Sequence, residues 1–241
     1  MRTVAAILAG GTGRRAGFST PKQLLMLGGK TVIEHSVAAF SAASQIDEIV
    51  VVMTPGLTGE VASLLARGGQ HKVTQVLAGG DTRSASAQRA LGALGSAECN
   101  VLLHDAARPL ISECVINSCV AALRSYEAVG VTIPSSDTIV VTANTVITQM
   151  PSRDGLHRCQ TPQGFRLSII RRAYELANAD PEFTATDDCG VVLRYLPEVP
   201  IAVVPGSERN MKITYRDDIA VAQTLLESGA QPGPGPAREG W

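Results

Sequence analysis

The chain has 241 residues, of which 45% are hydrophobic and 18% are charged, so its size and composition suit one globular domain with at most a small appendage. Its formal net charge of −1 provides no overall field to attract nucleic acid or an anionic membrane, so any polyanion site must be local. The five cysteines form no C-x-x-C pair, and no apolar run approaches the ~18 residues of a membrane span. We therefore expect a reduced, cytoplasmic protein without a signal peptide and without nucleic-acid or membrane partners.

Short β-branched runs alternate with helical patterns along the chain. The runs predicted as strands are residues 3–8, 49–54, 73–77, 101–104, 129–133 and 199–204. They lack strict alternation, as expected of strands that are covered on both faces. Helices are predicted at 35–43, 82–94, 112–126, 167–177 and 216–226, the first of them after a capping box of Thr31 and Glu34. This order predicts an α/β fold of Rossmann-like type, with a mostly parallel twisted sheet flanked by helices.

Two segments depart from this alternation. Residues 137–148 contain two short β runs around Ala143-Asn144, which predicts a hairpin or β-arm, at about 137–150, that stands apart from the main sheet. Residues 229–241 are rich in glycine and proline and are predicted to form a disordered tail. The predicted folded domain is therefore 1–228.

The most informative loop follows the first predicted strand and reads L-A-G-G-T-G-R-R-A-G from Leu8 to Gly17. Its glycines allow backbone N–H groups to approach an anion without interference from Cβ atoms. Arg14, Arg15 and Lys22 place three positive charges between residues 12 and 22, where no acidic residue occurs. This pattern predicts a local triphosphate site.

The same loop also satisfies the dinucleotide-binding pattern G-x-G-x-x-A at Gly11, Gly13 and Ala16. That pattern requires a helix beginning at the glycines and an acidic residue at the end of the second strand. Here the loop continues to Pro21, and the second strand ends V-M-T-P without an acid. An NAD-dependent oxidoreductase and a simple glycine-rich turn stay open as less favoured alternatives. A Walker loop is excluded because Gly-Lys-Ser/Thr is missing.

Two further polar loops follow predicted strands. The first reads G-G-D-T-R-S-A-S up to Ser86, and the second reads H-D-A-A-R-P from His104. Loops that follow parallel strands meet at the carboxyl edge of the sheet, where ligands bind. Asp105 is interpreted either as a Mg²⁺ ligand or as the cap of the next turn. His104 is interpreted as a structural histidine at a strand end.

A family resemblance emerges from the order and spacing of the motifs A-G-G-x-G-x-R, P-K-Q, G-G-D-x-R-x-x-S, H-D-A-A-R-P, S-D-T, R-D-G-L, Q-T-P-Q, T-D-D and M-K-I-T. From about Val4 to Leu226, the chain resembles the 2-C-methyl-D-erythritol 4-phosphate cytidylyltransferases and their relatives, the ribitol-5-phosphate cytidylyltransferases. The resemblance implies a nucleotidyltransferase domain that uses CTP and Mg²⁺, and a homodimer joined by the β-arm.

By position, the resemblance also implies the roles of individual residues. Stabilisation of the phosphoryl transfer is assigned to Arg15, Lys22 and Lys212. Contacts to the nucleotide are assigned to Ala9, Gly10, Gly11, Gly13, Gly80, Asp81 and Ser86. Contacts to the acceptor are assigned to Asp105, Arg108, Thr138 and Arg153, of which Thr138 and Arg153 would come from the partner subunit. Asp105 is also the candidate metal ligand, although the CTP phosphates would hold most of the Mg²⁺.

The chemistry of such a transfer agrees with the composition of these motifs. The acceptor phosphate is already a competent nucleophile, so no serine, cysteine or histidine has to be activated. Arg, Lys and Mg²⁺ would stabilise the charge on the α-phosphoryl group and on pyrophosphate. The five cysteines are accordingly interpreted as small core side chains, and His157 as a side chain that covers the arm.

The identity of the acceptor stays open between two polyol phosphates. The L-A-G-G opening at Leu8 is typical of the ribitol enzymes, and Val140 stands where the erythritol enzymes commonly have a basic residue. The blocks H-D-A-A-R-P and R-D-G-L instead favour 2-C-methyl-D-erythritol 4-phosphate, which we predict. Ribitol 5-phosphate is the main alternative and a phosphonate a third. A non-catalytic CTP-binding module is disfavoured, because sensing CTP would not require Arg15, Lys22 and Lys212 together.

Overall fold

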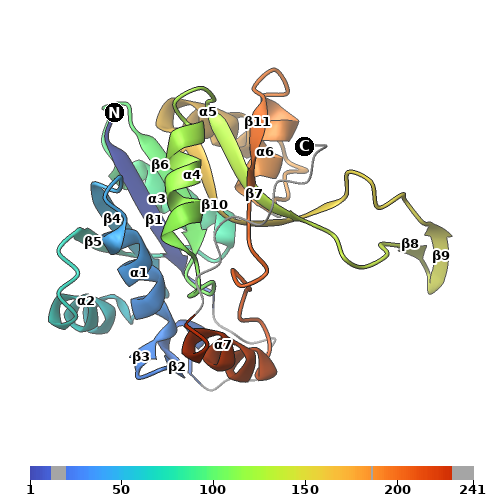
Figure 1. Ribbon diagram of the computed structural model, residues 1–241. Coiled ribbons are helices and arrows are strands. Elements are labelled where there is room, and N and C mark those ends of the chain that lie inside the picture. The colour runs from blue at the N-terminus through green and yellow to red at the C-terminus, as the bar shows by residue number, and fades with distance from the viewer. Residues whose placement is uncertain (12–19, 186, 230–241) are drawn as a thin grey trace.

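The computed structural model describes residues 1–11, 20–185 and 187–229. A central sheet carries helices on both faces, and a thin β-arm extends away from this body (Figure 1). Gly13 and Arg15 lie outside the described residues, and so does the predicted tail beyond Gly229. Among the described residues, no helix combines the length and apolar character of a membrane span.

Seven strands form the central sheet in the order β11-β7-β10-β6-β1-β4-β5. Only β10 runs antiparallel to its neighbours, β6 and β7, while the other pairs are parallel. The predicted α/β fold with a mostly parallel sheet is therefore confirmed. The strands are β1 Thr3–Ala9, β4 Glu48–Met53, β5 Val73–Ala78, β6 Asn100–Asp105, β7 Ala128–Pro134, β10 His157–Arg166 and β11 Ile201–Pro205.

Strand β1 shows how one short apolar run serves both faces of the sheet. Its alternate residues Val4, Ala6 and Leu8 belong to one hydrophobic core, and Ala5, Ile7 and Ala9 to the other. The first core is closed by α3 (Arg83–Ala93), α5 (Leu167–Asn178) and α6 (Asp188–Tyr195). The second is closed by α1 (Val32–Ala42), α2 (Thr58–Arg67) and α4 (Glu113–Ala122). Because both faces are covered, every side chain of β1 is buried and all of them after Thr3 are apolar, which explains the missing alternation.

The described part of the chain contains seven α-helices. Six of them, α1 to α6, cover the two faces of the sheet, and α7 packs on a smaller core. The capping box predicted at Thr31 and Glu34 is present, because the Thr31 hydroxyl accepts from Glu34 N and the Glu34 carboxylate accepts from Thr31 N. The helices are α1 Val32–Ala42, α2 Thr58–Arg67, α3 Arg83–Ala93, α4 Glu113–Ala122, α5 Leu167–Asn178, α6 Asp188–Tyr195 and α7 Asp217–Glu227.

Three of these elements, β10, α2 and α6, are absent from the sequence-based prediction. Strand β10 is polar at its start and contains Pro162 at an irregularity of its ladder, between Cys159 and Gln163. Helix α2 has no side-chain cap, and α6 has only eight residues. Local signals for these elements are therefore weak, and the surrounding sheet and helices determine their conformation.

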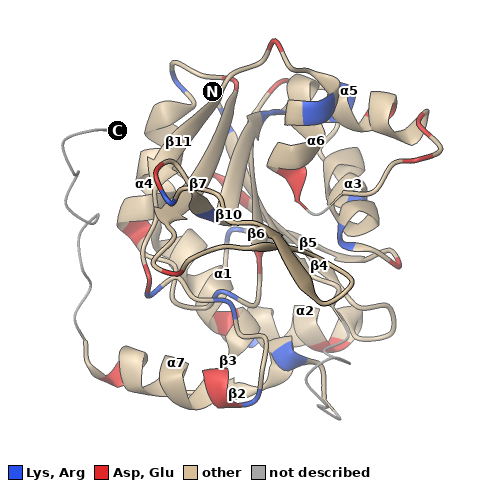
Figure 2. Ribbon diagram, turned by 90° about the vertical axis from the view of Figure 1, so that its right-hand side faces the viewer, with Lys and Arg blue, Asp and Glu red and all other residues tan. Residues whose placement is uncertain are grey.

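The predicted β-arm is present as the antiparallel hairpin of β8 Val141–Ala143 and β9 Val146–Gln149. Asn144 and Thr145 form its turn with φ angles of 48° and 74°, one position beyond the predicted turn. At the base of the arm, Ser135 N donates to Leu156 O at 2.9 Å. The hairpin projects from the β7 and β10 side of the body and carries no charged side chain (Figures 1 and 2).

A small separate core attaches α7 to a short hairpin and to the start of α1. It consists of Leu27, Val32, Ile213 and Ala222. Leu27 belongs to the short hairpin of β2 Met26–Leu27 and β3 Lys30–Thr31, which follows the 3-10 helix η2 Lys22–Leu24. This core brings the segment around Lys212, which precedes α7, close to the segment around Lys22.

Candidate active site

Loops that follow β1, β5 and β6 meet at the carboxyl edge of the sheet, as the parallel topology requires. The Gln23 amide donates to Ala9 O and, at 2.8 Å, to Gly11 O. Gln23 is 1% exposed, so a buried side chain fixes the start of the glycine loop. Gly13 and Arg15, the next predicted residues in the sequence, lie outside the described residues.

Ser86 joins the loop after β1 to the loop after β5. A Cβ atom on Gly10 would lie 2.9 Å from Ser86 Oγ, and one on Gly79 would lie 2.8 Å from the same atom. Gly80 N donates to Ser86 Oγ at 3.2 Å. Glycine is therefore required for this close approach, and Gly10, Gly80 and Ser86 lie together as predicted. Asp81 is exposed beside them.

Asp105 ends β6 and forms ion pairs with two cations. Its Oδ1 accepts from Arg83 Nε at 2.9 Å, and its Oδ2 accepts from Lys212 Nζ at 2.7 Å. The backbone N–H of Asp105 donates to Thr161 Oγ1 at 3.0 Å. Both carboxylate oxygens and the main chain of Asp105 are therefore held in place.

The two cations also control the ionisation of Asp105. Burial alone would raise the pKa of this carboxyl group, but the charges of Arg83 and Lys212 outweigh burial and hold the pKa well below its usual range. Asp105 is therefore a carboxylate throughout the neutral pH range. It can accept hydrogen bonds there but cannot act as a general acid.

Arg83 was part of a predicted motif but had no assigned role. It is the first residue of α3 and lies between two carboxylates, those of Asp105 and Asp188. Asp188 lies 105 positions away along the chain. Only the fold brings them together, and the sole sequence signal was the position of Arg83 inside a glycine-rich motif after a strand.

Arg108 is held in the same region by main-chain oxygens. Its guanidinium donates to Asn210 O at 2.8 Å and to Cys159 O at 3.4 Å. Burial lowers its pKa from the ordinary arginine value, although Asp105 opposes this effect. The Arg108 Nε atom is buried and has no hydrogen-bond partner among the described residues. One buried donor of Arg108 is therefore left unsatisfied by the described residues.

Lys22 and Lys212 come together from distant parts of the chain. Lys22 Nζ donates to Ile213 O at 3.0 Å, beside Lys212. Ile213 N in turn donates to Ala107 O at 2.8 Å, which anchors this segment to the loop after β6. Both predicted lysines therefore lie at the same sheet edge as Asp105.

Thr138 and Arg153 lie elsewhere, at the base of the β-arm. Both residues are exposed, and Arg153 donates to Ser136 O at 3.1 Å within the arm. The arm extends away from the edge where β1, β5 and β6 end (Figure 1). The site residues predicted from the resemblance thus form two groups within one chain.

The described side chains do not fit a protein-held metal ion. No group of three His, Cys, Asp or Glu side chains in this part of the chain is placed to bind one. Asp105 is the candidate ligand, yet each of its oxygens already accepts from a cation, and a divalent ion would meet the charges of Arg83 and Lys212. This donor set favours an ion that arrives with its own phosphate ligands.

His104 has the structural position expected of it. It is fully buried, with Nδ1 3.1 Å from Thr161 Oγ1 and Nε2 3.2 Å from Arg108 O. Burial lowers its pKa to about 4, so the imidazole is neutral near pH 7. His157, at the start of β10, lies with Nδ1 2.9 Å from Thr132 Oγ1.

The interpretation of all five cysteines as core side chains is only partly correct. Cys99, Cys119 and Cys189 are buried, and Cys114 is partly buried. Cys159 is exposed, because it precedes the irregularity of β10, where the strand leaves its regular ladder with β7.

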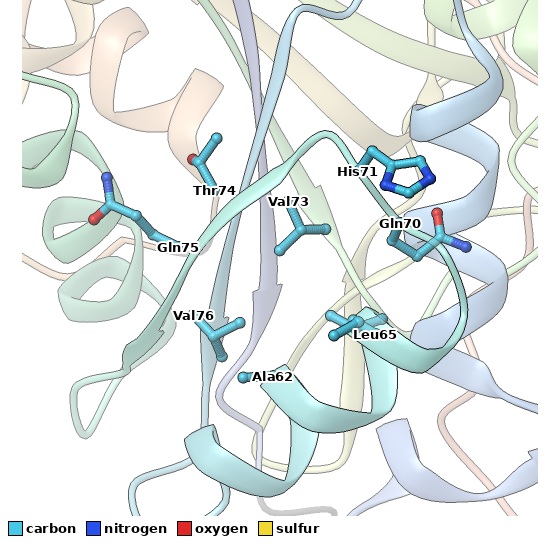
Figure 3. Close-up of a pocket in the computed structure, with 9 residues that line it drawn as sticks. Ala62, Leu65, Gln70, His71, Val73, Thr74, Gln75 and Val76 are labelled. Carbon is cyan, nitrogen blue, oxygen red and sulfur yellow. The ribbon is translucent and has the colours of Figure 1, made fainter.

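A separate cavity of about 340 Å³ lies between α2 and the edge strand β5 (Figure 3). Ala62, Leu65, Val73 and Val76 form its apolar part, and Gln70 and His71 lie at the loop between the two elements. No Lys or Arg lines it. This composition does not suit a triphosphate, so the carboxyl edge with its lysines and arginines is the stronger candidate site.

Comparisons with known proteins show what the whole chain is similar to. Residues 3–228 match the family described as "IspD: 2-C-methyl-D-erythritol 4-phosphate cytidylyltransferase". The chain is 52% identical over 235 residues to the 2-C-methyl-D-erythritol 4-phosphate cytidylyltransferase of Thermobifida fusca, with 95% of this chain and 94% of that protein covered.

A more distant relative and a solved structure are also similar to the chain. The bifunctional ribulose 5-phosphate reductase/CDP-ribitol pyrophosphorylase of Haemophilus influenzae is 37% identical, over 94% of this chain and 48% of that protein. The crystal structure of 4-diphosphocytidyl-2C-methyl-D-erythritol synthase from Anaerococcus prevotii superposes with a TM-score of 0.82 at 30% identity, covering 94% and 96% of the two chains.

Proposed function

The chain belongs to the 2-C-methyl-D-erythritol 4-phosphate cytidylyltransferase family, and we propose on this premise that it transfers CMP from CTP to 2-C-methyl-D-erythritol 4-phosphate. The observation that carries this proposal is the meeting of Lys22, Lys212 and Arg108 beside the glycine loop and Asp105. Cations grouped at one edge of the sheet suit the transfer of a phosphoryl group.

The reaction is a substitution at the α-phosphorus of CTP. A phosphate oxygen of the acceptor forms a new bond to this phosphorus, while the bond to the bridging oxygen of pyrophosphate breaks. Negative charge increases on the non-bridging oxygens and on the leaving group. Lys22 and Lys212 supply the positive charge that stabilises these oxygens, and no side chain has to accept a proton from the nucleophile.

We assign the nucleotide end of the site to main-chain groups. Gly10 and Gly80 pack closely against the start of α3, because a Cβ atom on Gly10 would meet Ser86 Oγ and one on Gly80 would meet Ala85 Cβ. Hydrogen bonds from fixed main-chain groups discriminate between bases by geometry. We assign cytosine and ribose contacts to Ala9, Gly10, Gly11, Gly80, Asp81 and Ser86.

Mg²⁺ enters this scheme as part of the CTP complex. The triphosphate supplies oxygen ligands, which Mg²⁺ prefers, and the ion reduces the repulsion between CTP and the acceptor phosphate. We assign the ion to the CTP phosphates because both oxygens of Asp105 already accept from Arg83 and Lys212. The chain's own contribution is Lys22 and Lys212 on the phosphate oxygens.

The acceptor phosphate is assigned to arginines of two subunits. Arg108 lies beside Asp105, and Arg153 with Thr138 lies at the base of the arm. The arm exposes the hydrophobic side chains Ile139, Val140, Val141, Val146, Ile147 and Met150. Exposed apolar groups of this number mark an interface, and a second copy of the chain would bury them and receive Arg153 at its own site.

Ribitol 5-phosphate is the second candidate acceptor. It is favoured by the 37% identity to the Haemophilus influenzae CDP-ribitol pyrophosphorylase and by Val140, which offers no charge in the arm. The higher identity to the methylerythritol enzyme of Thermobifida fusca favours the branched acceptor.

Phosphorus NMR tests the reaction itself. The protein is incubated with Mg²⁺, 2-C-methyl-D-erythritol 4-phosphate and CTP, UTP or ATP in turn. We expect the diphosphate signals of a CDP-linked product together with equimolar pyrophosphate, with CTP strongly preferred. Nucleotide hydrolysis without a linked product, or equal use of the three nucleotides, would contradict the proposal.

A further inference from the structure

Arg83 connects the candidate site to a carboxylate in the protein interior. Its Nε donates to Asp105 at 2.9 Å, and its NH1 donates to Asp188 Oδ2 at 2.7 Å. The three residues come from the start of α3, the end of β6 and the start of α6. One guanidinium group therefore joins three elements, and only a forked side chain can bridge two carboxylates in this way.

Asp188 is held in turn by groups from α5 and β10. Its side chain is 0% exposed, and its Oδ1 accepts from Tyr174 OH at 2.7 Å. Its backbone N–H donates to the buried Gln163 Oε1 at 2.9 Å. Because both carboxylate oxygens and the main chain of Asp188 have partners, this residue is a fixed support for Arg83.

Lys212 is at the other end of the chain of contacts. Its side chain is 40% exposed, and Asp105 Oδ2 lies 2.7 Å from its Nζ. An exposed ion pair between a lysine and a carboxylate normally contributes little stability, since both side chains must give up conformational freedom. Here the carboxylate is already immobile, so the lysine alone has to be ordered.

We propose that Asp188 and Arg83 act as positioning residues, which fix the Asp105 carboxylate and through it place the Lys212 ammonium group where the α-phosphate of CTP binds. Acidic and basic side chains alternate along the relay of Asp188, Arg83, Asp105 and Lys212. The Lys212 role rests on the proposed function, while the placement of the ammonium group does not. Loss of a group that orients a functional side chain lowers activity by about 10- to 100-fold.

The first test uses Asp188→Asn and Arg83→Lys with CTP and the acceptor. The asparagine keeps the shape of Asp188 but removes the charge, and the lysine keeps the charge of Arg83 but removes the fork. We expect kcat to fall by about 10- to 100-fold in each variant, with KM for CTP changed much less. Parent-level kcat in Arg83→Lys would show that bridging is not required.

Asp180→Asn is a matched control. Asp180 Oδ2 accepts from Arg194 at 2.7 Å and from Tyr195 at 2.6 Å, so it has the same types of partner outside the site. We expect this variant to keep the parent kcat. An equal fall in kcat in Asp180→Asn and Asp188→Asn would reduce the relay to a general effect on folding and overturn the proposal.

A double-mutant cycle separates positioning from a structural role. If Asp188 acts through Lys212, Asp188→Asn should have no further effect on kcat once Lys212→Ala is present. A residue that only stabilises the fold would lower the active fraction by the same factor in both backgrounds, and that result would contradict the relay. Should Asp188→Asn not fold, Tyr174→Phe weakens the same support and is expected to lower kcat several-fold.

A measurement without turnover keeps the relay separate from the proposed reaction. Lysines are ¹³C-methylated, and the Lys212 signal is assigned from its loss in Lys212→Ala. In Asp188→Asn and Arg83→Lys, the chemical shift of the Lys212 methyl groups should move toward that of the exposed Lys30. An unchanged Lys212 chemical shift in both variants would overturn the relay. If the shift changes as expected but the parent protein does not transfer CMP, only the proposed function is overturned.

Discussion

Single residues in this site work mainly through charge and position. Lys22 reaches the main chain next to Lys212, because Lys22 Nζ donates to Ile213 O, although the two lysines are distant in sequence. Asp105 stays ionised because Arg83 and Lys212 hold its pKa down. A site of this kind does not require an activated nucleophile, since the acceptor phosphate brings its own.

The charge of Lys22 can be tested by Lys22→Ala, with the exposed Lys30→Ala as control. If Lys22 stabilises the oxygens of the α- and β-phosphates during transfer, its loss should lower kcat by about 100-fold and leave KM for the acceptor nearly unchanged. Steady-state pyrophosphate release measures both parameters. Near-parent turnover in Lys22→Ala would remove this lysine from the mechanism, and Lys30→Ala should match the parent.

Buried His104 predicts a pH dependence of stability. Its pKa is lowered to about 4 in the folded protein from 6.5, so the unfolded chain binds the extra proton more readily. The folded state is therefore destabilised as pH falls from 6.5 to 4, by about 3 kcal/mol over this window. Asp105, whose pKa is depressed, loses its contribution only at still lower pH.

Urea unfolding at several pH values measures this contribution. In His104→Gln, the decrease in the free energy of unfolding between pH 6.5 and 4 should be smaller than in the parent. The exposed His71→Gln serves as the control and should keep the parent slope. An unchanged slope in His104→Gln would show that His104 does not cause the acid-side loss of stability.

At the scale of elements, the sequence predicted the parts with strong local signals. The buried β-branched runs of β1 and β4 and the capping box of α1 required no tertiary information. Strand β10 was missed because it is polar, contains Pro162 and owes its place to β6 and β7 on either side. Arg83 was missed because its partner Asp188 is 105 positions away, beyond any local pattern.

The close contact between the loops after β1 and β5 gives an element-scale prediction. In Gly79→Ala, the added methyl would lie 2.8 Å from Ser86 Oγ and 3.3 Å from Met53 O, so Ser86 must shift. We expect KM for CTP to rise about 10-fold and stability to fall by about 1–3 kcal/mol. Gly92→Ala, where nothing lies within 4 Å, should do neither. Unchanged CTP binding in Gly79→Ala would separate Ser86 from the nucleotide site.

The arm predicts an active site shared between two subunits. Arg153→Ala removes a group that would act in the partner's site, and Lys22→Ala removes one from its own site. Mixed dimers should regain activity, since one of their two sites has both residues. Activity is measured after mixing, with subunit exchange followed by fluorescence energy transfer. Exchange without recovered activity would contradict the shared site.

At the scale of the whole molecule, the sheet collects the nucleotide and phosphate groups at one edge, while the arm holds Thr138 and Arg153 away from it. In the proposed site, the acceptor contacts are therefore divided between the two groups, with Asp105 and Arg108 at the sheet edge and Thr138 and Arg153 on the arm. The exposed apolar side chains of the arm explain how a second copy would complete the site. The resemblance predicted these residues, but only the fold shows that they divide into two groups.

The central claim is CMP transfer onto a branched polyol phosphate, and a comparison of acceptors tests it most directly. The kcat/KM for 2-C-methyl-D-erythritol 4-phosphate and for ribitol 5-phosphate is measured with the same enzyme, CTP and Mg²⁺ by pyrophosphate release. A pocket shaped for the methyl branch leaves hydroxyl groups of linear ribitol without hydrogen-bond partners, so we predict a clear preference for the erythritol phosphate. A kcat/KM for ribitol 5-phosphate equal to or above that for methylerythritol phosphate would contradict the assigned acceptor, and no pyrophosphate with either would contradict the transfer itself.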